Sequence, residues 1–399
     1  MLRYFNDIKK SFKLKHYVNY IAISAVLLLF TVLYYAGALN RSTPSLLTEI
    51  GYSIILAVSL NLVVGFLGEL SLGHAGFMCI GAFLGTFIAN LLVDAGCQVY
   101  LAMLISLVLG GCVAALFGFI VGIPALRLRG DYLAIVTLAF GEIVGNICKN
   151  IPFFGGAKGL ESYGFSKIIA TARNGKGIPL FIPTFIILLL MLAVVQNLIR
   201  SKHGRAITAI RDNEIAAKSM GTNVTAYKLL AFIVSAFFAG MAGVIYGFNT
   251  TPILYGNFSY NYSIEILVMV VLGGMGSING SIIAATLIVF INNFLTSKLG
   301  GDMAAIKTLV YALILIIVVI YKNAPALKKY RDKFSVRAIV EFVSTKLGKH
   351  KDESHVTDDL GEWDVIPTKI KTDEILSTDF ALTTFEPDKP DKRGGNDNE

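Results

Sequence analysis

A few polar residues interrupt long apolar stretches of this chain, and these positions are the best suited to do chemistry. Glu69 and His74 lie in one glycine-rich stretch, and Glu142 follows Thr137 by five residues in another. An ionisable group inside a membrane is costly, so it faces protein or water and often serves the passage of ions or solutes. We therefore expect Glu142 to face the protein interior or a water-filled path. Glu69 is interpreted as a hydrated residue at the membrane boundary.

Glycines in such stretches offer a second kind of chemistry. Gly73 directly precedes His74, and Gly273, Gly274 and Gly276 lie together near another apolar run. A helix broken by glycines exposes backbone N–H and C=O groups, which are tolerated only against protein or water. Such a break contacts a solute, forms a gate or serves as a packing turn. The candidate translocation path comprises Gly73, His74, Thr137, Glu142, Gly273, Gly274 and Gly276.

The sequence offers little for catalysis. Its four cysteines form no Cys-x-x-Cys pair and have no histidine at metal-ligand spacing, which predicts no metal site. The glycines around Lys158 lack the spacing of the phosphate-binding motif G-x-x-x-x-G-K-[ST]. No nucleophile–base pair stands out among the five histidines. We therefore expect neither an enzyme nor a chain that itself binds ATP or another cofactor.

Composition defines the elements that must hold these residues. Hydrophobic residues make up 55% of the chain and charged residues only 16%, whereas soluble domains are about one-quarter charged. Uncharged runs long enough to cross a bilayer recur through its first four-fifths. This composition excludes a soluble enzyme, a disulfide-held domain and a nucleic-acid-binding protein as the main class. The predicted fold is an all-α polytopic transmembrane bundle in contact with membrane lipid.

Ten apolar runs are candidate membrane segments, and we expect about 8–10 of them to enter the membrane. They are residues 18–38, 46–67, 76–93, 100–126, 132–148, 180–198, 229–248, 264–274, 281–295 and 303–321. A helix that crosses about 30 Å of hydrocarbon needs about 20 residues. Residues 264–274 and 281–295 are therefore interpreted as two short segments of a discontinuous pair around a glycine-rich turn.

Charge sets the expected orientation. Residues 351–399 contain fourteen acidic and six basic residues, so residues 1–350 carry a net charge of +16. Basic loops stay on the cytoplasmic side, which places both termini there. The predicted cytoplasmic clusters are residues 1–15, Arg127 with Arg129, residues 200–228 and residues 322–333. Residues 149–176 contradict the rule, because they carry five basic residues yet fall outside.

The chain is accordingly divided into four parts. A cytoplasmic N-terminus, residues 1–17, precedes a transmembrane domain, residues 18–321, which contains the loop 200–228. Residues 322–350 form a basic amphipathic juxtamembrane segment that suits the inner leaflet or the protein body. Residues 351–399 form an acidic tail that is predicted to be disordered.

The loop 200–228 contains the signals of a short, well-capped helix. Asp212 is the predicted N-cap, Glu214 lies in the first turn and Lys218 in the last, and Gly221 ends the helix. A stiff helix in such a loop can transmit force to a partner whose groove receives it. The alternative is a solvated connector with ordinary caps, and local features alone leave the two about even.

Four stretches, taken in order, resemble a known family. They are LSLGHAGFMCIGAF (70–83), GDYLAIVTLAFGEI (130–143), HGRAITAIRDNEIAAKSMG (203–221) and VLGGMGSINGS (271–281). Together they resemble the membrane subunits of bacterial ABC importers for branched-chain amino acids, over roughly residues 50–320. The chain is more similar to the longer of the two permease subunits in such systems.

The resemblance implies an assembly in the bacterial plasma (inner) membrane. A second homologous permease pairs with the chain, two cytoplasmic ATPases bind ATP and Mg²⁺, and a periplasmic or lipid-anchored protein delivers leucine, isoleucine or valine. No nucleic acid takes part. Glu214, Ala217 and Gly221 match the EAA coupling loop of such permeases. The implied coupling residues are Arg211, Asp212, Glu214, Ala216, Ala217 and Gly221.

Some positions depart from the family pattern. The family usually has Gln in place of Glu69 and often Pro in place of Ser281, and the acidic extension is not usual in it. Relatives also carry urea or short amides. The alternative function is an ion-coupled secondary transporter of small polar or amino-acid solutes, with Glu142, Glu265 and His74 as coupling sites. That alternative leaves the capped helix in the loop 200–228 unexplained.

Overall fold

The computed structural model describes residues 18–37, 42–128, 130–162 and 178–299, with Leu313 and Ile316. All of them fall within Met1–Asn323, the first of two units into which the chain divides. The predictions for residues 1–17, 322–350 and 351–399, and most of the predicted span 303–321, therefore lie outside the described residues.

Helices of membrane-spanning length dominate this part of the chain, which confirms the all-α polytopic prediction. Seven stretches among the described residues are long and apolar enough to cross a membrane. They belong to α3 (Thr43–Asn61) with the π-helix η2 (Leu62–Leu67), α4 (His74–Asp94), α5 (Val99–Ala125), α6 (Asp131–Asn150), α8 (Phe181–Arg200), α11 (Val224–Asn249) and α13 (Ile278–Leu299). The shorter apolar helices are α2 (Val18–Tyr35) and α12 (Tyr260–Gly273).

The remaining described elements are short. They are α9 (Lys202–Asp212), α10 (Glu214–Ser219) and the 3₁₀ turns η3 (Pro152–Phe154), η4 (Gly156–Lys158) and η5 (Tyr255–Phe258). Leu160 and Ile253 form an isolated antiparallel bridge.

The prediction of two short segments around the second glycine-rich turn is right for the first segment and wrong for the second. α12 has 14 residues, as a short segment should, but α13 has 22. α13 begins at Ile278, before the apolar run, and continues past Leu295 to Leu299. Thr296 Oγ1 donates to the Asn292 carbonyl and Ser297 Oγ to that of Phe294, so these hydroxyls are satisfied locally within the helix. Counting apolar residues therefore made this helix too short at both ends.

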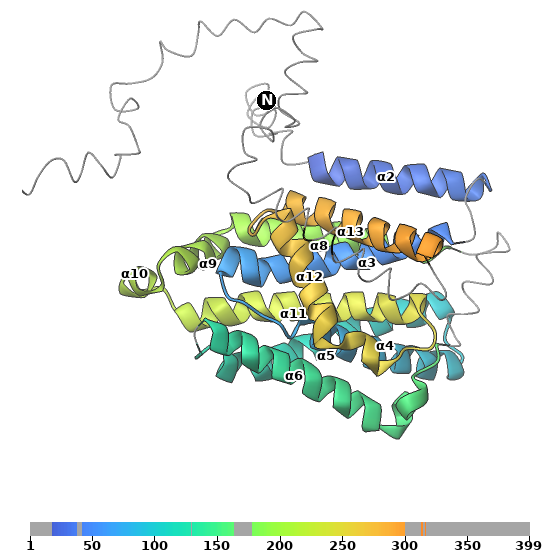
Figure 1. The fold of residues 1–399 in the computed structure, drawn as a ribbon, viewed down its shortest axis with the longest axis horizontal. Helices are drawn as coiled ribbons and strands as arrows, with labels where there is room; N and C mark the ends of the chain where they lie inside the picture. Colours follow the sequence, from blue (N-terminus) through green and yellow to red (C-terminus); the bar gives the residue numbers. More distant parts are fainter. Residues whose placement is uncertain are drawn as a thin grey trace, which may run out of the picture. The chain divides into compact units, whose positions relative to one another are not determined.

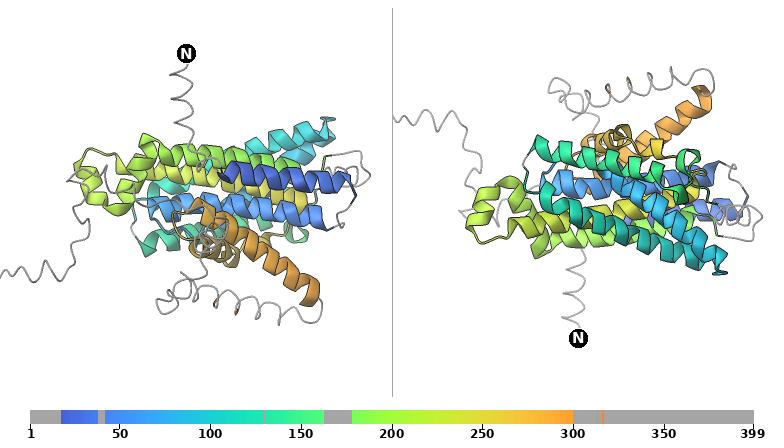
Figure 2. Two further views of the ribbon diagram at one scale, coloured as in Figure 1. Left: turned by 90° about the horizontal axis from the view of Figure 1, so that it is seen from above. Right: turned by 90° about the horizontal axis from the view of Figure 1, so that it is seen from below.

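α3, α4 and α11 form the centre of the bundle, and glycines let them approach closely (Figures 1 and 2). The hydrophobic stretch of α3 with η2 is 89% buried, whereas that of α5 is only 33% buried. A Cβ atom at Gly81 of α4 would overlap the backbone of Gly240 in α11, and one at Gly243 would overlap the Met78 carbonyl. Small residues at such contacts are how membrane helices gain packing energy.

Two predicted basic clusters lie at the same end of the bundle. α9 and α10 stand at one end of α3 and α11 (Figure 1). Gly122, near the end of α5, lies against Leu229 and Phe232 of α11, which brings Arg127 to this end. The bridge between Leu160 and Ile253 follows the other ends of α6 and α11. The side of the membrane that each end faces stays a prediction.

Candidate functional site

The loop between α8 and α11 folds into two helices, of which the sequence predicted only the second. The side chain of Ser201 caps α9 by accepting from the backbone N–H groups of His203 and Gly204. Ile207 and Ile210 of α9 are buried. A serine followed by apolar residues three apart is an amphipathic-helix signal, so α9 was detectable from the sequence.

α10 is capped at its start by Asn213, so the prediction of Asp212 as its N-cap is wrong. Asn213 has an extended backbone, and its Oδ1 accepts from the Ala216 N–H at 3.0 Å. Asp212 is still helical as the last residue of α9, and its carboxylate lies 3.0 Å from Arg211 Nη2. An N-cap residue must leave helical geometry, and here α9 keeps Asp212 within it.

The other signals of α10 are confirmed. Glu214 lies in its first turn and Lys218 in its last. Gly221 has a φ of +81°, its N–H donates to the Lys218 carbonyl, and the Thr222 N–H donates to that of Ala217. These two bonds form the glycine C-cap in which the left-handed residue satisfies free carbonyls. The helix is therefore fixed at both ends.

The apolar residues of α10 are divided between the protein and solvent. Ala217 is buried, whereas Ile215 is 73% exposed and Met220 is 86% exposed. Ala216 is also exposed. An apolar surface on a fixed helix at the end of a bundle is typical of a contact with another protein.

A buried lysine connects α10 to the bundle. Lys228 of α11 is 3% exposed, and its Nζ lies 2.5 Å from Glu69 Oε1 and 3.2 Å from Glu214 Oε2. The side chain of Glu69 is only 13% exposed, so its interpretation as a simply hydrated residue is wrong. A buried lysine attracts carboxylates because an unpaired ammonium loses its hydration without compensation.

Arg211 makes a second connection. Its Nη1 donates to the Gly65 carbonyl at 3.0 Å. Gly65 lies in η2, the π-helical end of α3, where the last carbonyls have no partner within the helix. A cation at a helix C-terminus is also favoured by the helix dipole. α9 and α10 thus both contact the segment formed by η2 and the residues after it.

The turn between α12 and α13 contacts the same segment, and Gly276 of this turn lies beside both the Gly65 carbonyl and Arg211 Nη1. Asn61, which is fully buried, accepts from the Gly276 N–H through Oδ1 and donates to the Ser277 carbonyl and Ser281 Oγ. A Cβ atom at Gly65 would overlap the Gly276 backbone. Gly273 and Gly276 therefore serve close packing, and Gly274, with a φ of +97°, turns the chain.

The other glycine-rich break, before α4, is fixed to α6. The Leu72 N–H donates to Thr137 Oγ1 at 3.0 Å, and a Cβ atom at Gly73 would overlap the Thr137 carbonyl. His74 is 2% exposed, with Nε2 2.9 Å from Ser59 Oγ. Gly73, His74 and Thr137 therefore meet where α3, α4 and α6 converge.

Glu142 has a structural partner. Its Oε1 accepts from the backbone N–H of Tyr260, the first residue of α12, at 3.0 Å. A carboxylate at a helix N-terminus is stabilised by the helix dipole. The expectation that Glu142 faces protein is confirmed. At the start of α6, Gly130 occupies the N-cap position and Asp131 lies in the first turn.

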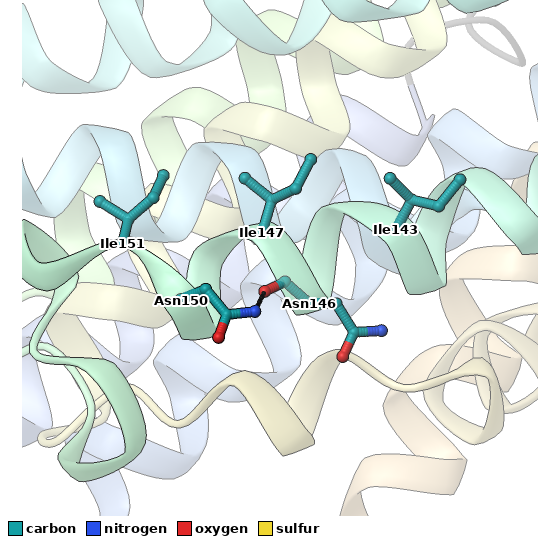
Figure 3. Close-up of a pocket in the computed structure, with 5 residues that line it drawn as sticks. All are labelled: Ile143, Asn146, Ile147, Asn150 and Ile151. Carbon is teal, nitrogen blue, oxygen red and sulfur yellow. Dashed lines mark hydrogen bonds between the residues drawn. The ribbon is translucent and has the colours of Figure 1, made fainter.

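The predicted path residues thus form two groups rather than one. Thr137 and Glu142 lie on α6 with Gly73 packed against Thr137, while in the second break Gly276 lies against η2 and Gly273 packs against the start of α13. Neither group lines the open hollow of about 400 Å³ on the outer surface of α6. Figure 3 shows its lining, with Asn150 Nδ2 donating to the Asn146 carbonyl. The lining residues are Ile143, Asn146, Ile147, Asn150 and Ile151.

Most of this chain matches a known protein family. Residues 42–319 match the family described as "Branched-chain amino acid transport system / permease component". The chain belongs to this family. It is therefore a multi-pass membrane permease of an ABC transporter and not an enzyme.

The relatives of this chain are described as transport permeases. The permease is 35% identical over 294 residues to the high-affinity branched-chain amino acid permease protein LivM of Salmonella typhimurium, covering 66% of this chain and 68% of that protein. It is 27% identical to a probable LivM of Methanocaldococcus jannaschii, covering 65% and 77%. It is also 25% identical to the ribose import permease RbsC of Escherichia coli, covering 70% and 84%. No solved structure matches the permease.

Three residues of this site were missed by sequence reasoning. Asn61, Asn213 and Lys228 were not singled out, although each bonds across an element boundary. For Lys228 a signal existed, because a lone lysine between Tyr227 and Leu229 in an apolar helix needs a buried partner. For Asn61 the signal was weaker, since a single amide in a long span is compatible with many faces.

Proposed function

We propose that this permease forms part of the path for branched-chain amino acids in an ATP-driven importer, and that α9 and α10 couple it to cytoplasmic ATPases. The observation that carries the proposal is the stiff, doubly capped α10 with exposed Ile215 and Met220. The LivM protein of Salmonella typhimurium supports the amino-acid class, because its identity of 35% exceeds that of the ribose permease at 25%.

In this proposal the six coupling residues have different roles, either contacting the ATPase or holding the α9–α10 segment in place. Ala216, beside Ile215 and Met220, contacts a groove of the ATPase, because small and apolar exposed side chains allow close insertion. Ala217 packs inward and holds α10 on the bundle. Gly221 fixes where α10 ends. Glu214 and Arg211 tie the segment to the bundle, and Asp212 pairs with Arg211.

The translocation path is proposed to run beside the two glycine-rich breaks, before α4 and between α12 and α13. The residues proposed to lie near it are Gly73, His74, Thr137, Glu142, Gly273, Gly274 and Gly276. The exposed face of α6 suits a second homologous permease, because Asn146 and Asn150 would be poorly satisfied by lipid. An apolar path with few polar groups matches the side chain, ammonium and carboxylate of such an amino acid.

The assembly includes partners that supply energy and substrate. Two ATPase subunits bind ATP and Mg²⁺, and a periplasmic or lipid-anchored protein delivers the amino acid. The location that fits is the bacterial plasma membrane, with α9 and α10 in the cytoplasm. ATP binding draws the ATPases together, α10 moves with them, and the paired permeases alternate between outward- and inward-facing states.

The rival proposal, ion-coupled secondary transport, needs ionisable groups free to bind and release ions. Glu142 instead bonds to the start of α12, and Glu69 pairs with Lys228. His74 lies against Ser59. Glu265, the remaining candidate, is half-buried and has an interaction partner. The observed contacts thus give these groups structural roles, which favours the ATP-driven proposal.

Co-purification and reconstitution test the proposal. The permease is purified from native membranes, and two ATPase subunits per permease pair are expected with it. Vesicles containing the complex and its binding protein should accumulate radiolabelled leucine, isoleucine or valine only with ATP. Vesicles with the permease alone should not. Accumulation driven by a proton or sodium gradient alone would refute the ATP-driven mechanism, and ATP-driven uptake of ribose alone would refute the substrate class.

A further inference from the structure

We propose that Lys228 is a positioning residue that passes the movement of α10 to η2 and, through it, to the turn between α12 and α13. This inference rests on the proposed coupling of α10 to an ATPase. It goes further by assigning the link inside the permease, which involves Lys228, Glu69 and Asn61 in addition to the EAA-type helix.

The first part of the link is a buried charge cluster. Lys228 comes from α11, Glu214 from α10 and Glu69 from the residues after η2. Since the lysine is 3% exposed, moving either carboxylate away leaves a buried charge with only one of its two partners. A movement of α10 therefore acts on Lys228 through Glu214, and Lys228 in turn holds Glu69. Lys218, by comparison, is exposed in the last turn of α10, so its charge is hydrated however α10 moves.

The second part is Arg211, which holds the same segment a few residues earlier. Its Nη1 donates to the Gly65 carbonyl within η2, whereas Glu69 follows the end of η2 at Gly68. α9 thus contacts the π-helix itself, and α10 contacts the chain directly after it. A force on the α9–α10 segment reaches η2 at both points.

The third part is the π-helix, which can exist in two arrangements. A π-turn contains one more residue than an α-turn. Conversion of η2 to an α-helix would rotate the following residues by about 100° and shift them by about 1.5 Å. Asn61, directly before η2, holds Gly276, Ser277 and Ser281, and Gly65 within η2 packs against the Gly276 backbone. A change in η2 therefore moves Gly65 against the turn between α12 and α13.

Hydrogen–deuterium exchange on the complete complex tests this link. Exchange in residues 62–69 and 274–281 is measured with and without a non-hydrolysable ATP analogue. The wild-type complex is expected to change exchange in both segments. The Lys228→Met complex should lose that response and transport about tenfold less leucine per ATP hydrolysed, in the range of typical coupling between sites. Lys158→Met, at an exposed lysine of η4 outside the α9–α10 segment, is the matched control and should respond as the wild type does.

A purely structural role for Lys228 is separated by two further variants. The Lys228→Met/Glu69→Gln variant removes one of the two carboxylates that the lysine would leave unpaired. Glu69→Ala alone removes the hydrogen bond from Lys228 to residue 69, keeps the pair of Lys228 and Glu214, and is measured if neither Lys228 variant assembles. Each should assemble with the ATPases yet lack the response in residues 62–69. A wild-type response and coupling ratio in any assembled variant overturns the inference.

The same experiment distinguishes the two levels of proposal. If the wild-type permease binds no ATPase, the proposed function fails. If the complex forms and transports, but the Lys228→Met complex responds as the wild type does, only the role of Lys228 fails.

Discussion

The α9–α10 segment and the two glycine-rich breaks are held in opposite ways. Charged side chains and helix caps hold the α9–α10 segment, with Lys228, Glu69 and Arg211 reaching between elements. Uncharged hydrogen bonds and direct backbone contacts hold residues 72–73 and 274–277, through Thr137 and Asn61, whereas Glu69 at the start of the first break belongs to the charged network. Exposed apolar residues occur in both regions, Ile215 on α10 and Met275 in the second break, but glycines of the breaks, such as Gly73 and Gly273, lie against neighbouring backbone.

This difference indicates where each region tolerates change. A long charged side chain bridges several ångströms and can adjust, so the α9–α10 segment can move while it remains connected. A glycine packed against a neighbouring backbone has no such freedom. Substitutions in the breaks should therefore reduce stability first, and those in the α9–α10 segment should reduce coupling first. The variants below test this contrast in order of expected effect.

The largest effect is expected for Gly65→Ala. The new methyl group would overlap the Gly276 backbone and the Asn61 side chain, and overpacking of this kind costs about 3 kcal/mol. The control is Gly145→Ala on α6, where a Cβ atom meets nothing within 4 Å. Thermal unfolding in detergent should show a large loss for the first variant and no loss for the second. Equal stability would contradict the close packing of η2.

Asn61→Ala should have the next largest effect. It removes the acceptor of the Gly276 N–H and the donor to Ser277 and Ser281. Leaving such buried groups unpaired costs about 1–3 kcal/mol. Asn197→Ala on α8 is the matched control, because Asn197 is exposed. Unfolding of the two variants is compared in the same detergent, and a loss as large in the control would argue against a special role for Asn61.

Gly221→Val addresses the α9–α10 segment. The space around Gly221 is open, but its φ of +81° is strained for valine, at about 1–2 kcal/mol. The end of α10 should shift, so that uptake per ATP hydrolysed falls while the ATPases remain bound. Gly221→Asn should retain most coupling, because asparagine tolerates this conformation. Normal uptake by the valine variant would refute the role of Gly221.

The smallest effects are expected for substitutions at the observed N-cap of α10, Asn213, and at the predicted one, Asp212. Asn213→Ala removes the side chain that caps the Ala216 N–H and should destabilise α10 by about 1 kcal/mol. Asp212→Ala removes only an exposed pair with Arg211, which is worth about 0.5 kcal/mol or less. Local hydrogen exchange of residues 214–219 reports the difference. The reverse order of effects would restore Asp212 as the cap.

Signals that act within one element were readable from the sequence. The apolar runs predicted every described membrane helix, and Glu214, Lys218 and Gly221 gave the polarity and end of α10. Errors arose where a neighbouring element decided the outcome. α9 kept Asp212 helical and moved the cap of α10 to Asn213.

The amino-acid sequence determined the membrane helices, the capped α10 and the permease family, because periodicity, caps and motifs depend on neighbouring residues. The tertiary structure decided which polar groups meet. Lys228 and Glu69 are 159 residues apart, and Asn61 and Gly276 are 215 apart. An apolar helix in lipid has little amphipathic pattern to indicate its inner face, so close packing at glycines decided how the helices are rotated and which polar side chains are brought together.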